Sequence, residues 1–274
     1  MLTAEQIAHF ETFGFVVRRQ CFSASEMEDI CEAFDEVLAE DRQGKPFEGE
    51  KRQAVLGFIE KRPLLSALVE DDRIYEPLEQ LLGPGFVWIG SDGNLYVGDT
   101  GWHPDGSVLD YGRIKVALYL DTVTEDTGCL RVIPGSHQLP LHAALDPLRQ
   151  QRHSPDETVF GAAGRDLPCF PLESEPGDVV FFNQNLWHSA FGGRTGRRMF
   201  TMNFGAQPSR KKDIEFLKRV YQGNLEHVKN MQYTQSARVY EDAFLYSDSP
   251  RIQGMGASWW SWDSSDGGRR AARK

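Results

Sequence analysis

His103 and Asp105 lie two residues apart in the sequence, and a second histidine that can join them, His188, comes far later. Two imidazoles and one carboxylate form the 2-His-1-carboxylate set that holds non-haem Fe(II) and leaves other coordination positions open. On a strand, residues i and i+2 project to the same side, so the imidazole of His103 and the carboxylate of Asp105 can reach one ion. These three residues are therefore the candidate metal ligands and candidate catalytic residues of an oxygen-activating site.

A similar tripeptide, His9-Phe10-Glu11, lies near the N-terminus but is predicted to be helical. Thr3 and Gln6 fit a capping box, in which both side chains satisfy backbone N–H groups at a helix start. In a helix, positions i and i+2 diverge by about 200°, so these two side chains cannot easily share an ion. His137, after Pro-Gly-Ser, is interpreted as a hydrogen-bond partner in a turn. The histidines without a partner at ligand spacing are interpreted as surface residues: His142, His153 and His227.

Helices are predicted before and after the segment that carries the candidate ligands. Ser23 and Glu26 form a second capping-box pattern, followed by apolar residues at helical spacing as far as Leu38. A short strand is expected at 15–19 and a polar loop with Gly and Pro at 41–52. Helical spacing returns at 63–82 and again at 208–229.

The pattern between these helices changes to short β runs separated by turn residues. The expected strands are 86–90, 94–98, 113–121, 128–133, 178–182, 187–191 and 197–204. Many short strands separated by Gly, Pro and Asp are typical of a sandwich or barrel rather than a parallel α/β sheet. The predicted fold class is mainly β, an antiparallel core with N-terminal and C-terminal helices packed on one sheet.

Side-chain alternation along the expected strands predicts which residues face the interior. Along 113–121, even positions form an apolar face suited to packing against helices, while Lys115, Ala117 and Tyr119 lie on the opposite face. Along 197–204, Arg197 lies on the more polar face, which the same argument turns inward. A guanidinium inside an apolar core is costly unless paired, and its planar fork suits a carboxylate. Arg197 is therefore the candidate for holding a dicarboxylate co-substrate.

Other cations compete for that role. Arg194 and Arg198 lie in the same expected hairpin region, and each is otherwise explained as a solvated turn residue. Lys115 is a candidate to assist the same carboxylate or to receive an anionic substrate, with an edge-strand lysine as the alternative. Tyr119, which shares its face, is a further candidate for co-substrate binding.

Composition excludes several classes of protein. The chain has 274 residues and a formal net charge of -10, which argues against a nucleic-acid partner. Its four cysteines have no metal-ligand spacing and do not make a disulfide framework, which indicates reduced thiols and a cytoplasmic location. No secretion signal or apolar run of about 18 residues is recognised, so no membrane association is expected. The expected partner is a small-molecule substrate, and the chain is expected to be a monomer or homodimer.

Several separated motifs resemble the phytanoyl-CoA dioxygenase family of Fe(II)/2-oxoglutarate-dependent oxygenases. They are LTAEQIAHFETFGFVV, FSASEMEDI, GDTGWHPD, YLDTVTEDTGCLRVIPGSH, PGDVVFFNQNLWHSAF and RRMFTMNF, in the order of the family. The resemblance implies a double-stranded β-helix, or jelly roll, with iron on His103, Asp105 and His188 and 2-oxoglutarate on Arg197. It implies Fe(II), 2-oxoglutarate and O2 as cofactor and co-substrates, with ascorbate as a stimulant. We expect one domain over 1–250, with the jelly-roll core at 86–205, and a C-terminal extension at 251–274, whose end SSDGGRRAARK has the composition of a disordered basic tail.

The chain departs from the family pattern in two places. Members often have Gly-Ser after the distal histidine, with the serine near the co-substrate, where this chain has Ser189 and Ala190. The segment from His188 to Arg197 is also slightly short, which keeps Arg198 as a rival. Asp105 is present, whereas related halogenases replace this carboxylate with a small residue, so halogenation is disfavoured.

The expected reaction couples oxidative decarboxylation of 2-oxoglutarate to hydroxylation of an unactivated C–H bond, with release of succinate and CO2. Desaturation, ring formation or epimerisation can follow from the same chemistry.

The sequence leaves two alternative functions open: a jelly-roll binding or scaffold protein with a vestigial metal site, and a cupin-like isomerase or hydrolase that uses zinc or manganese. The C-terminal SWWSW is expected to close the pocket, to mediate dimerisation or to pack on a helix.

Overall fold

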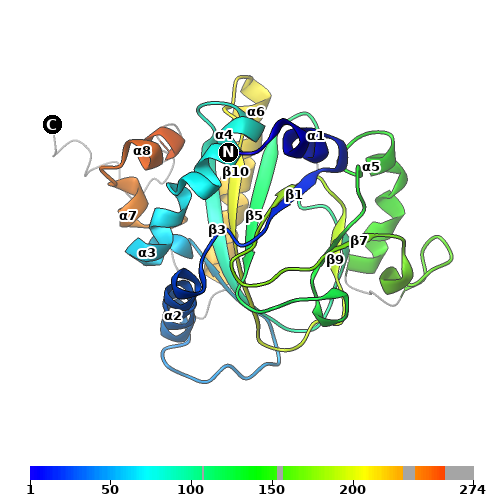
Figure 1. The fold of residues 1–274 in the computed structure, drawn as a ribbon, viewed down its shortest axis with the longest axis horizontal. Coiled ribbons are helices and arrows are strands. Elements are labelled where there is room, and N and C mark those ends of the chain that lie inside the picture. The colour runs from blue at the N-terminus through cyan, green and yellow to red at the C-terminus, as the bar shows by residue number, and fades with distance from the viewer. Residues whose placement is uncertain (107, 153–156, 231–237, 257–274) are drawn as a thin grey trace.

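Two antiparallel β-sheets face each other, with most helices on the outer side of the larger sheet (Figure 1). The computed structural model describes residues 1–106, 108–152, 157–230 and 238–256. The predicted disordered tail and the SWWSW segment lie outside these residues. No helix in the described part of the chain is long and apolar enough to cross a membrane.

The larger sheet has six strands in the order β1, β8, β5, β10, β3, β2. They are β1 (Phe15–Arg18), β2 (Gln53–Leu56), β3 (Val87–Tyr96), β5 (Arg113–Tyr119), β8 (Val179–Asn183) and β10 (Arg197–Gly205). The smaller sheet has the order β4, β9, β6, β7. Its strands are β4 (Thr100–His103), β6 (Leu130–Val132), β7 (Phe170–Leu172) and β9 (His188–Ala190).

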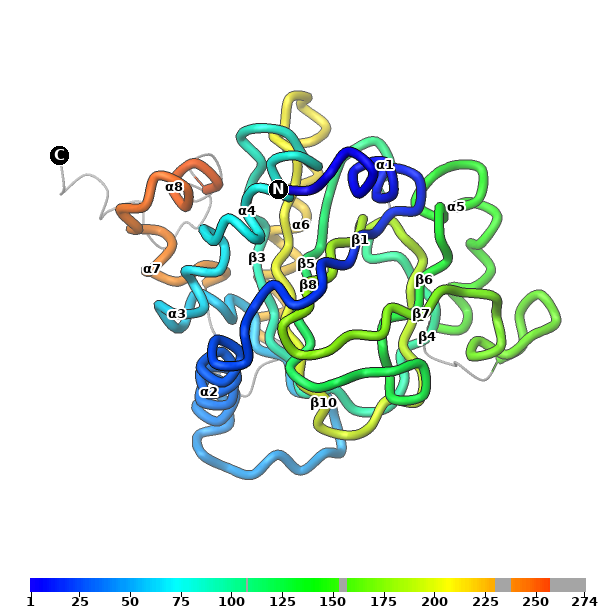
Figure 2. Tube along the Cα trace, viewed as in Figure 1, coloured from blue at the N-terminus to red at the C-terminus, as the bar shows by residue number. Residues whose placement is uncertain are grey.

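From β3 to β10 the chain crosses repeatedly between the two sheets. β3, β5, β8 and β10 belong to the larger sheet, and the segments between them supply β4, β6, β7 and β9 to the smaller one. Figure 2 shows β5 and β8 on one side of the fold, with β4, β6 and β7 on the other. Residues far apart in the sequence therefore line one interior, as the two predicted histidine ligands require.

The helices begin and end largely where the sequence signals predict. They are α1 (Ala4–Phe13), α2 (Ala24–Asp41), α3 (Pro63–Ser66), α4 (Asp72–Leu82), α5 (Leu141–Ala144), α6 (Lys211–Asn230), α7 (Asp242–Leu245) and α8 (Pro250–Gly256). The short 3-10 helices are η1 (Ile59–Lys61), η2 (Ala67–Val69), η3 (Glu125–Thr127), η4 (Asp146–Arg152) and η5 (Gly164–Asp166). Both predicted capping boxes form, at Thr3 with Gln6 and at Ser23 with Glu26. In α1, His9 packs on Phe13 and Phe15 at ring distances of 4.8 and 5.1 Å, as an ordinary helix residue.

The two faces of the larger sheet differ as the alternation argument predicts. Ile114, Val116 and Leu118 of β5 belong to the main core with the helices, whereas Ala117 and Tyr119 belong to a separate inner cluster. The register of β5 with β10 places Met199 beside Tyr119 and Asn203 beside Lys115. One face of the sheet therefore holds the helices and the other lines the interior.

The strand prediction differs from the structure in two respects. The expected turn between 86–90 and 94–98 is absent, because β3 runs straight through it. Gly93 lies within this strand because the ring of Phe58 packs on it, and a Cβ there would approach the ring to 2.2 Å. Three strands lie outside the expected strand segments: β2, which follows the polar loop, β4 and β7.

Candidate active site

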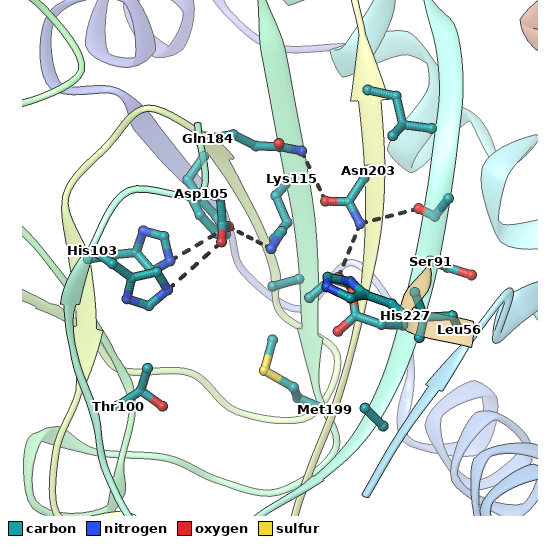
Figure 3. A pocket seen from close by; sticks show the side chains of 18 of the residues that line it. Leu56, Ser91, Thr100, His103, Asp105, Lys115, Gln184, Met199, Asn203 and His227 are labelled. Atoms are coloured by element: carbon teal, nitrogen blue, oxygen red, sulfur yellow. Dashed lines mark hydrogen bonds and ion pairs between the residues drawn. The ribbon is translucent and has the colours of Figure 1, made fainter. Parts of the chain in front are cut away.

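The three predicted metal ligands converge at one end of the interior. His103 ends β4 and His188 begins β9, and these two residues are paired across the strands. Asp105 follows after Pro104, with Oδ1 3.8 Å from His103 Nε2 and Oδ2 3.6 Å from His188 Nε2. The three ligand atoms all lie within 4.8 Å of one another, so one ion can meet all of them. Figure 3 shows Asp105 turned toward the imidazole rings.

Both imidazoles are held in the tautomer that metal binding requires. His103 Nδ1 lies 2.8 Å from the carbonyl oxygen of Gly101, and His188 Nδ1 lies 2.8 Å from that of Leu186. A carbonyl oxygen can only accept, so each Nδ1 carries the hydrogen and each Nε2 keeps its lone pair. Burial lowers the pKa of His103 to about 3, assisted by His188, and burial also lowers the pKa of His188. Both rings are therefore neutral at neutral pH, and each Nε2 can donate its lone pair to a metal ion.

Lys115 forms an ion pair with Asp105, the carboxylate among the three candidate metal ligands. Its Nζ lies 2.6 Å from Asp105 Oδ2, and it comes from the centre of the larger sheet rather than from an edge strand. Burial disfavours the charge on Asp105, but Lys115 and the two imidazoles outweigh this and hold its pKa well below the usual range. Asp105 is therefore ionised, and Lys115 fixes one of its oxygens while the other remains available to an ion.

A cavity of about 750 Å³ extends from these ligands between the two sheets. Every residue predicted for the site lines it: His103, Asp105, His188, Lys115, Tyr119 and Arg197. Its volume lies within the range of small-molecule sites. The structure thus brings all the candidate residues to one space.

Arg197 lies inside the protein with hydrogen-bonding capacity left over. The residue is 2% exposed, and its Nε and Nη1 have no partner. Its guanidinium occupies a space that two glycines leave open, since a Cβ at Gly193 or Gly128 would lie 1.9 or 2.1 Å from Nη1. The ring of Tyr96 lies 5.2 Å from Cζ. A buried, unpaired guanidinium in a fitted space is suited to an anionic ligand.

The rival arginines are occupied elsewhere. Arg198 points to the outer face, where it binds Asp121 at 3.1 Å and Asp35 at 2.9 Å. Arg194 has a side chain that is 63% exposed and pairs with Asp121 at 3.3 Å. Neither lines the cavity, so the geometry favours Arg197 for the co-substrate.

The residues after the distal histidine and on β5 complete this end of the cavity. Ala190, two residues after His188, shares its side of β9, and it offers no hydroxyl where many family members have serine. Tyr119 is buried, and burial raises its pKa above the usual range, so its phenol stays protonated.

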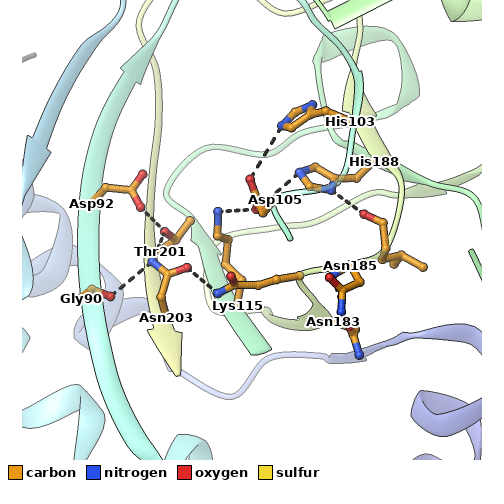
Figure 4. A network of polar contacts seen from close by, with 12 residues as sticks. Gly90, Asp92, His103, Asp105, Lys115, Asn183, Asn185, His188, Thr201 and Asn203 are labelled. Atoms are coloured by element: carbon orange, nitrogen blue, oxygen red, sulfur yellow. Dashed lines mark hydrogen bonds and ion pairs between the residues drawn. The ribbon is translucent and has the colours of Figure 1, made fainter. Parts of the chain in front are cut away.

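Several lining residues were not anticipated from the sequence. Gln184 Nε2 donates to Asn203 Oδ1 at 2.9 Å. Figure 4 shows Thr201, which donates to Asp92, beside Asn203 on the same face of the sheet as Lys115. Arg113 also lines the cavity. Because residues 113 and 115 lie on the same face of β5, strand alternation could have predicted this position. Asp92 was missed because Asp-Gly indicated a turn.

Helix α6 closes part of the cavity through Val220, Gly223, Asn224 and His227. His227 is exposed, as predicted, and it also lines the cavity. His142 was predicted to lie on the surface, and that was wrong. It is 8% exposed, with Nδ1 2.9 Å from the carbonyl oxygen of Ser136. His137 contacts the Glu11 carbonyl at 3.3 Å, as a turn residue, and His153 lies outside the described residues.

Comparisons with known proteins agree with this geometry. The family model for phytanoyl-CoA dioxygenase (PhyH) matches residues 10–200. The chain is 25% identical over 223 residues to an ectoine dioxygenase of Sphingopyxis alaskensis, covering 71% of this chain and 72% of that protein. It is 24% identical over 260 residues to a 2-aminoethylphosphonate dioxygenase of uncultured bacterium HF130_AEPn_1, covering 87% of this chain and 96% of that protein.

Solved structures show the same fold. The crystal structure of EctD from S. alaskensis with bound Fe has a TM-score of 0.58 at 22% identity, covering 75% of this chain and 77% of that chain. HygX from Streptomyces hygroscopicus with nickel and 2-oxoglutarate bound has a TM-score of 0.59 at 18% identity, covering 76% and 88%. The predicted jelly-roll architecture is confirmed, as two facing sheets rather than a closed barrel.

The fold and the convergent metal ligands define a non-haem iron dioxygenase of the 2-oxoglutarate-dependent class, as the sequence predicted. The chain belongs to the phytanoyl-CoA dioxygenase (PhyH) family.

Proposed function

We propose that this protein hydroxylates an unactivated C–H bond of a small molecule, using Fe(II), O2 and 2-oxoglutarate and releasing succinate and CO2. One observation carries the proposal: a set of two imidazoles and one carboxylate shares a cavity with the buried Arg197, whose Nε and Nη1 lack partners. A vestigial scaffold has no need of this combination, and a metal-dependent isomerase has no need of the arginine.

The donor set fits iron. His103 and His188 would supply Nε2 and Asp105 would supply a carboxylate oxygen, which is the ligand set of the facial triad. Iron bound there supplies O2 activation, in which oxidative decarboxylation of 2-oxoglutarate is coupled to oxidation of the substrate. The carbonyls of Gly101 and Leu186 hold the rings in place through their Nδ1–H groups. Lys115 would hold one oxygen of Asp105 by its ion pair and so orient the carboxylate.

Arg197 would bind the distal carboxylate of 2-oxoglutarate through its unpartnered N–H groups. Tyr119 and Tyr96 would complete the walls around this molecule, and the apolar side chains of the inner cluster would exclude water from it. These roles make His103, Asp105 and His188 the metal site, with Arg197, Lys115 and Tyr119 as the co-substrate site. The unit that performs the reaction is proposed to be a single domain over 1–250.

The proposal is tested by adding Fe(II) and then 2-oxoglutarate to the protein without oxygen. The expected result is the weak visible charge-transfer band of the iron-bound co-substrate, absent from Asp105→Ala and shifted to higher co-substrate concentration in Arg197→Gln. If wild type shows no band, and Asp105→Ala binds iron as well as wild type, the protein is not this kind of oxygenase. A metabolite screen for substrate-stimulated succinate release, with the mass shift of the product, then identifies the bond that is oxidised.

A further inference from the structure

A second buried arginine in the cavity has no partner for its charge. Arg113 is 5% exposed, and its Nε is buried without a hydrogen bond. Its side chain forms no ion pair or hydrogen bond within the described residues, although it lines the cavity. Burying an unpaired charged group is costly, so such a group indicates a missing ligand.

The surroundings hold the guanidinium in place without neutralising it. Its Cζ lies 4.7 Å from the centre of the Phe216 ring on α6. A Cβ at Gly106 would lie 2.4 Å from Nη2, so the backbone next to Asp105 approaches the guanidinium closely. Asp105 is the nearby carboxylate, but Lys115 already binds it at 2.6 Å. The guanidinium is fixed beside the metal ligands and has N–H groups to spare.

Arg113 cannot be a second contact for the co-substrate carboxylate that Arg197 would hold. Arg113 begins β5, opposite Gly205, whereas Tyr119 ends the strand opposite Met199, and Arg197 lies two residues beyond Met199. At about 3.3 Å per residue, the two ends of β5 are about 20 Å apart. Lys115, the partner of Asp105, lies on the same face of β5, two residues from Arg113. Arg113 therefore lies at the end of β5 nearer the metal ligands, whereas Arg197 lies beyond the other end.

The charge of the cavity agrees with an anionic occupant. The protein as a whole has a formal net charge of -10. The cavity is nevertheless lined by five cationic side chains, Arg52, Arg113, Lys115, Arg152 and Arg197, against two carboxylates, Asp92 and Asp105. A cationic pocket in an acidic protein attracts a small anion and repels a large polyanion.

We propose that Arg113 binds an anionic group of the primary substrate, a carboxylate, phosphonate or phosphate, and so places a nearby C–H bond at the iron. The proposal rests on the proposed function, because it assigns the substrate end of the same site. A planar guanidinium can donate two parallel N–H bonds to any of these groups. Arg113 is thus a specificity-determining residue, and substrates without a negative charge near the reactive carbon are excluded.

The test uses small anions as probes. Methylphosphonate and acetate are titrated calorimetrically, each in turn, into oxygen-free protein that holds Fe(II) and saturating 2-oxoglutarate, which fills the Arg197 site. We expect wild type to bind at least one probe and not the uncharged dimethyl ester of methylphosphonate. The preferred probe tells a phosphonate or phosphate site from a carboxylate site. Arg113→Met is expected to weaken binding of that probe at least tenfold and to leave the charge-transfer band unchanged.

Arg219→Met is a matched control. Arg219 lies 5.9 Å from the centre of the same Phe216 ring, but it is exposed and does not line the cavity. The Arg219→Met variant should bind the probe with the same affinity as wild type. Arg113→Met should unfold at the same temperature as wild type or higher, because an unpaired buried charge has been removed. A purely structural arginine would instead lower the unfolding temperature and leave probe binding unchanged.

The outcomes separate this proposal from the proposed function. Absence of the charge-transfer band in wild type contradicts the oxygenase, and the titration is then repeated on metal-free protein to test the anion site alone. A normal band with no probe bound, or with equal probe affinity in Arg113→Met, overturns the role of Arg113 and leaves the oxygenase intact.

Discussion

The two faces of the six-stranded sheet carry different properties on alternate residues of the same strands. On β10, Phe200, Met202 and Phe204 are fully buried among the helices, whereas Arg197 and Asn203 line the cavity. The outer face satisfies apolar packing, and the inner face keeps polar groups whose partners are to come from ligands. Neighbouring residues on one strand therefore serve different purposes. Substitutions on the outer face should change stability, and substitutions on the inner face should change ligand binding.

Asp105→Ala tests the inner face at its most sensitive point. Loss of residues that only orient metal ligands typically costs 10- to 100-fold, so loss of a ligand should reduce iron affinity and turnover by more than about 100-fold. Iron titration and succinate release measure the effect, with circular dichroism as a control for folding. Activity within tenfold of wild type would remove Asp105 from the metal site.

Glu60, on the helix-covered side of the sheet, should make the free energy of unfolding depend on pH. It is 3% exposed and accepts hydrogen bonds from Trp88 Nε1 at 2.9 Å and the Glu241 amide at 2.6 Å. Burial raises its pKa from 4.5 to about 8. Between these values the folded protein keeps a proton that the unfolded chain has released, so the free energy of unfolding should fall as pH rises, by about 4 kcal/mol. Denaturant unfolding at pH 5 and 8.5 measures this.

Glu60→Gln should unfold with a smaller dependence on pH than wild type, because the titrating group is gone. The difference between the two proteins isolates Glu60 from all other carboxylates. Equal slopes in both proteins would show that Glu60 ionises normally. Co-substrate affinity, which depends on the inner face, should be the same in both.

Arg197→Gln removes the guanidinium from the inner face. Hydrogen bonds to charged groups are each worth about 1.5–3 kcal/mol, so KM for 2-oxoglutarate should rise about 10- to 100-fold. Steady-state succinate release against co-substrate concentration measures it. The unfolding temperature should not fall, because the lost charge had no protein partner for its Nε and Nη1. An unchanged KM would contradict the co-substrate role.

Arg198→Gln is the matching change on the outer face and should have the smallest effect. It removes contacts with Asp121 and Asp35 that are partly exposed to solvent. Such pairs contribute about 1 kcal/mol or less, so unfolding should shift slightly while KM for 2-oxoglutarate stays the same. A raised KM would show that the two arginines share the co-substrate.

Alternation of side chains predicted much of the site from the sequence. It placed Lys115, Tyr119 and Arg197 on the inner face without a structure, because strand geometry fixes every second side chain once the strand is recognised. The same alternation applies to Arg113. That residue went unrecognised because a cation at the first position of a strand resembles an ordinary turn residue.

Other features depend on contacts that no local pattern reveals. His142 is a polar residue on a short helix, yet it is buried, with its ring 5.9 Å from that of Trp187. The helix at 208–229 was predictable, but which of its residues meet the cavity depends on how it packs against β2. Asp92 and Gly93 lie inside a continuous strand that pairs with β10 and β2, and Phe58, far away in sequence, covers Gly93.

The placement of α6 has an evolutionary consequence. The part of the chain that matches the family ends at residue 200, whereas α6 begins at Lys211 and still contributes walls to the cavity. The proposed iron ligands and the proposed co-substrate arginine all lie before α6. A lineage can therefore lengthen, replace or re-angle this helix and acquire a new substrate while it inherits the oxidant unchanged.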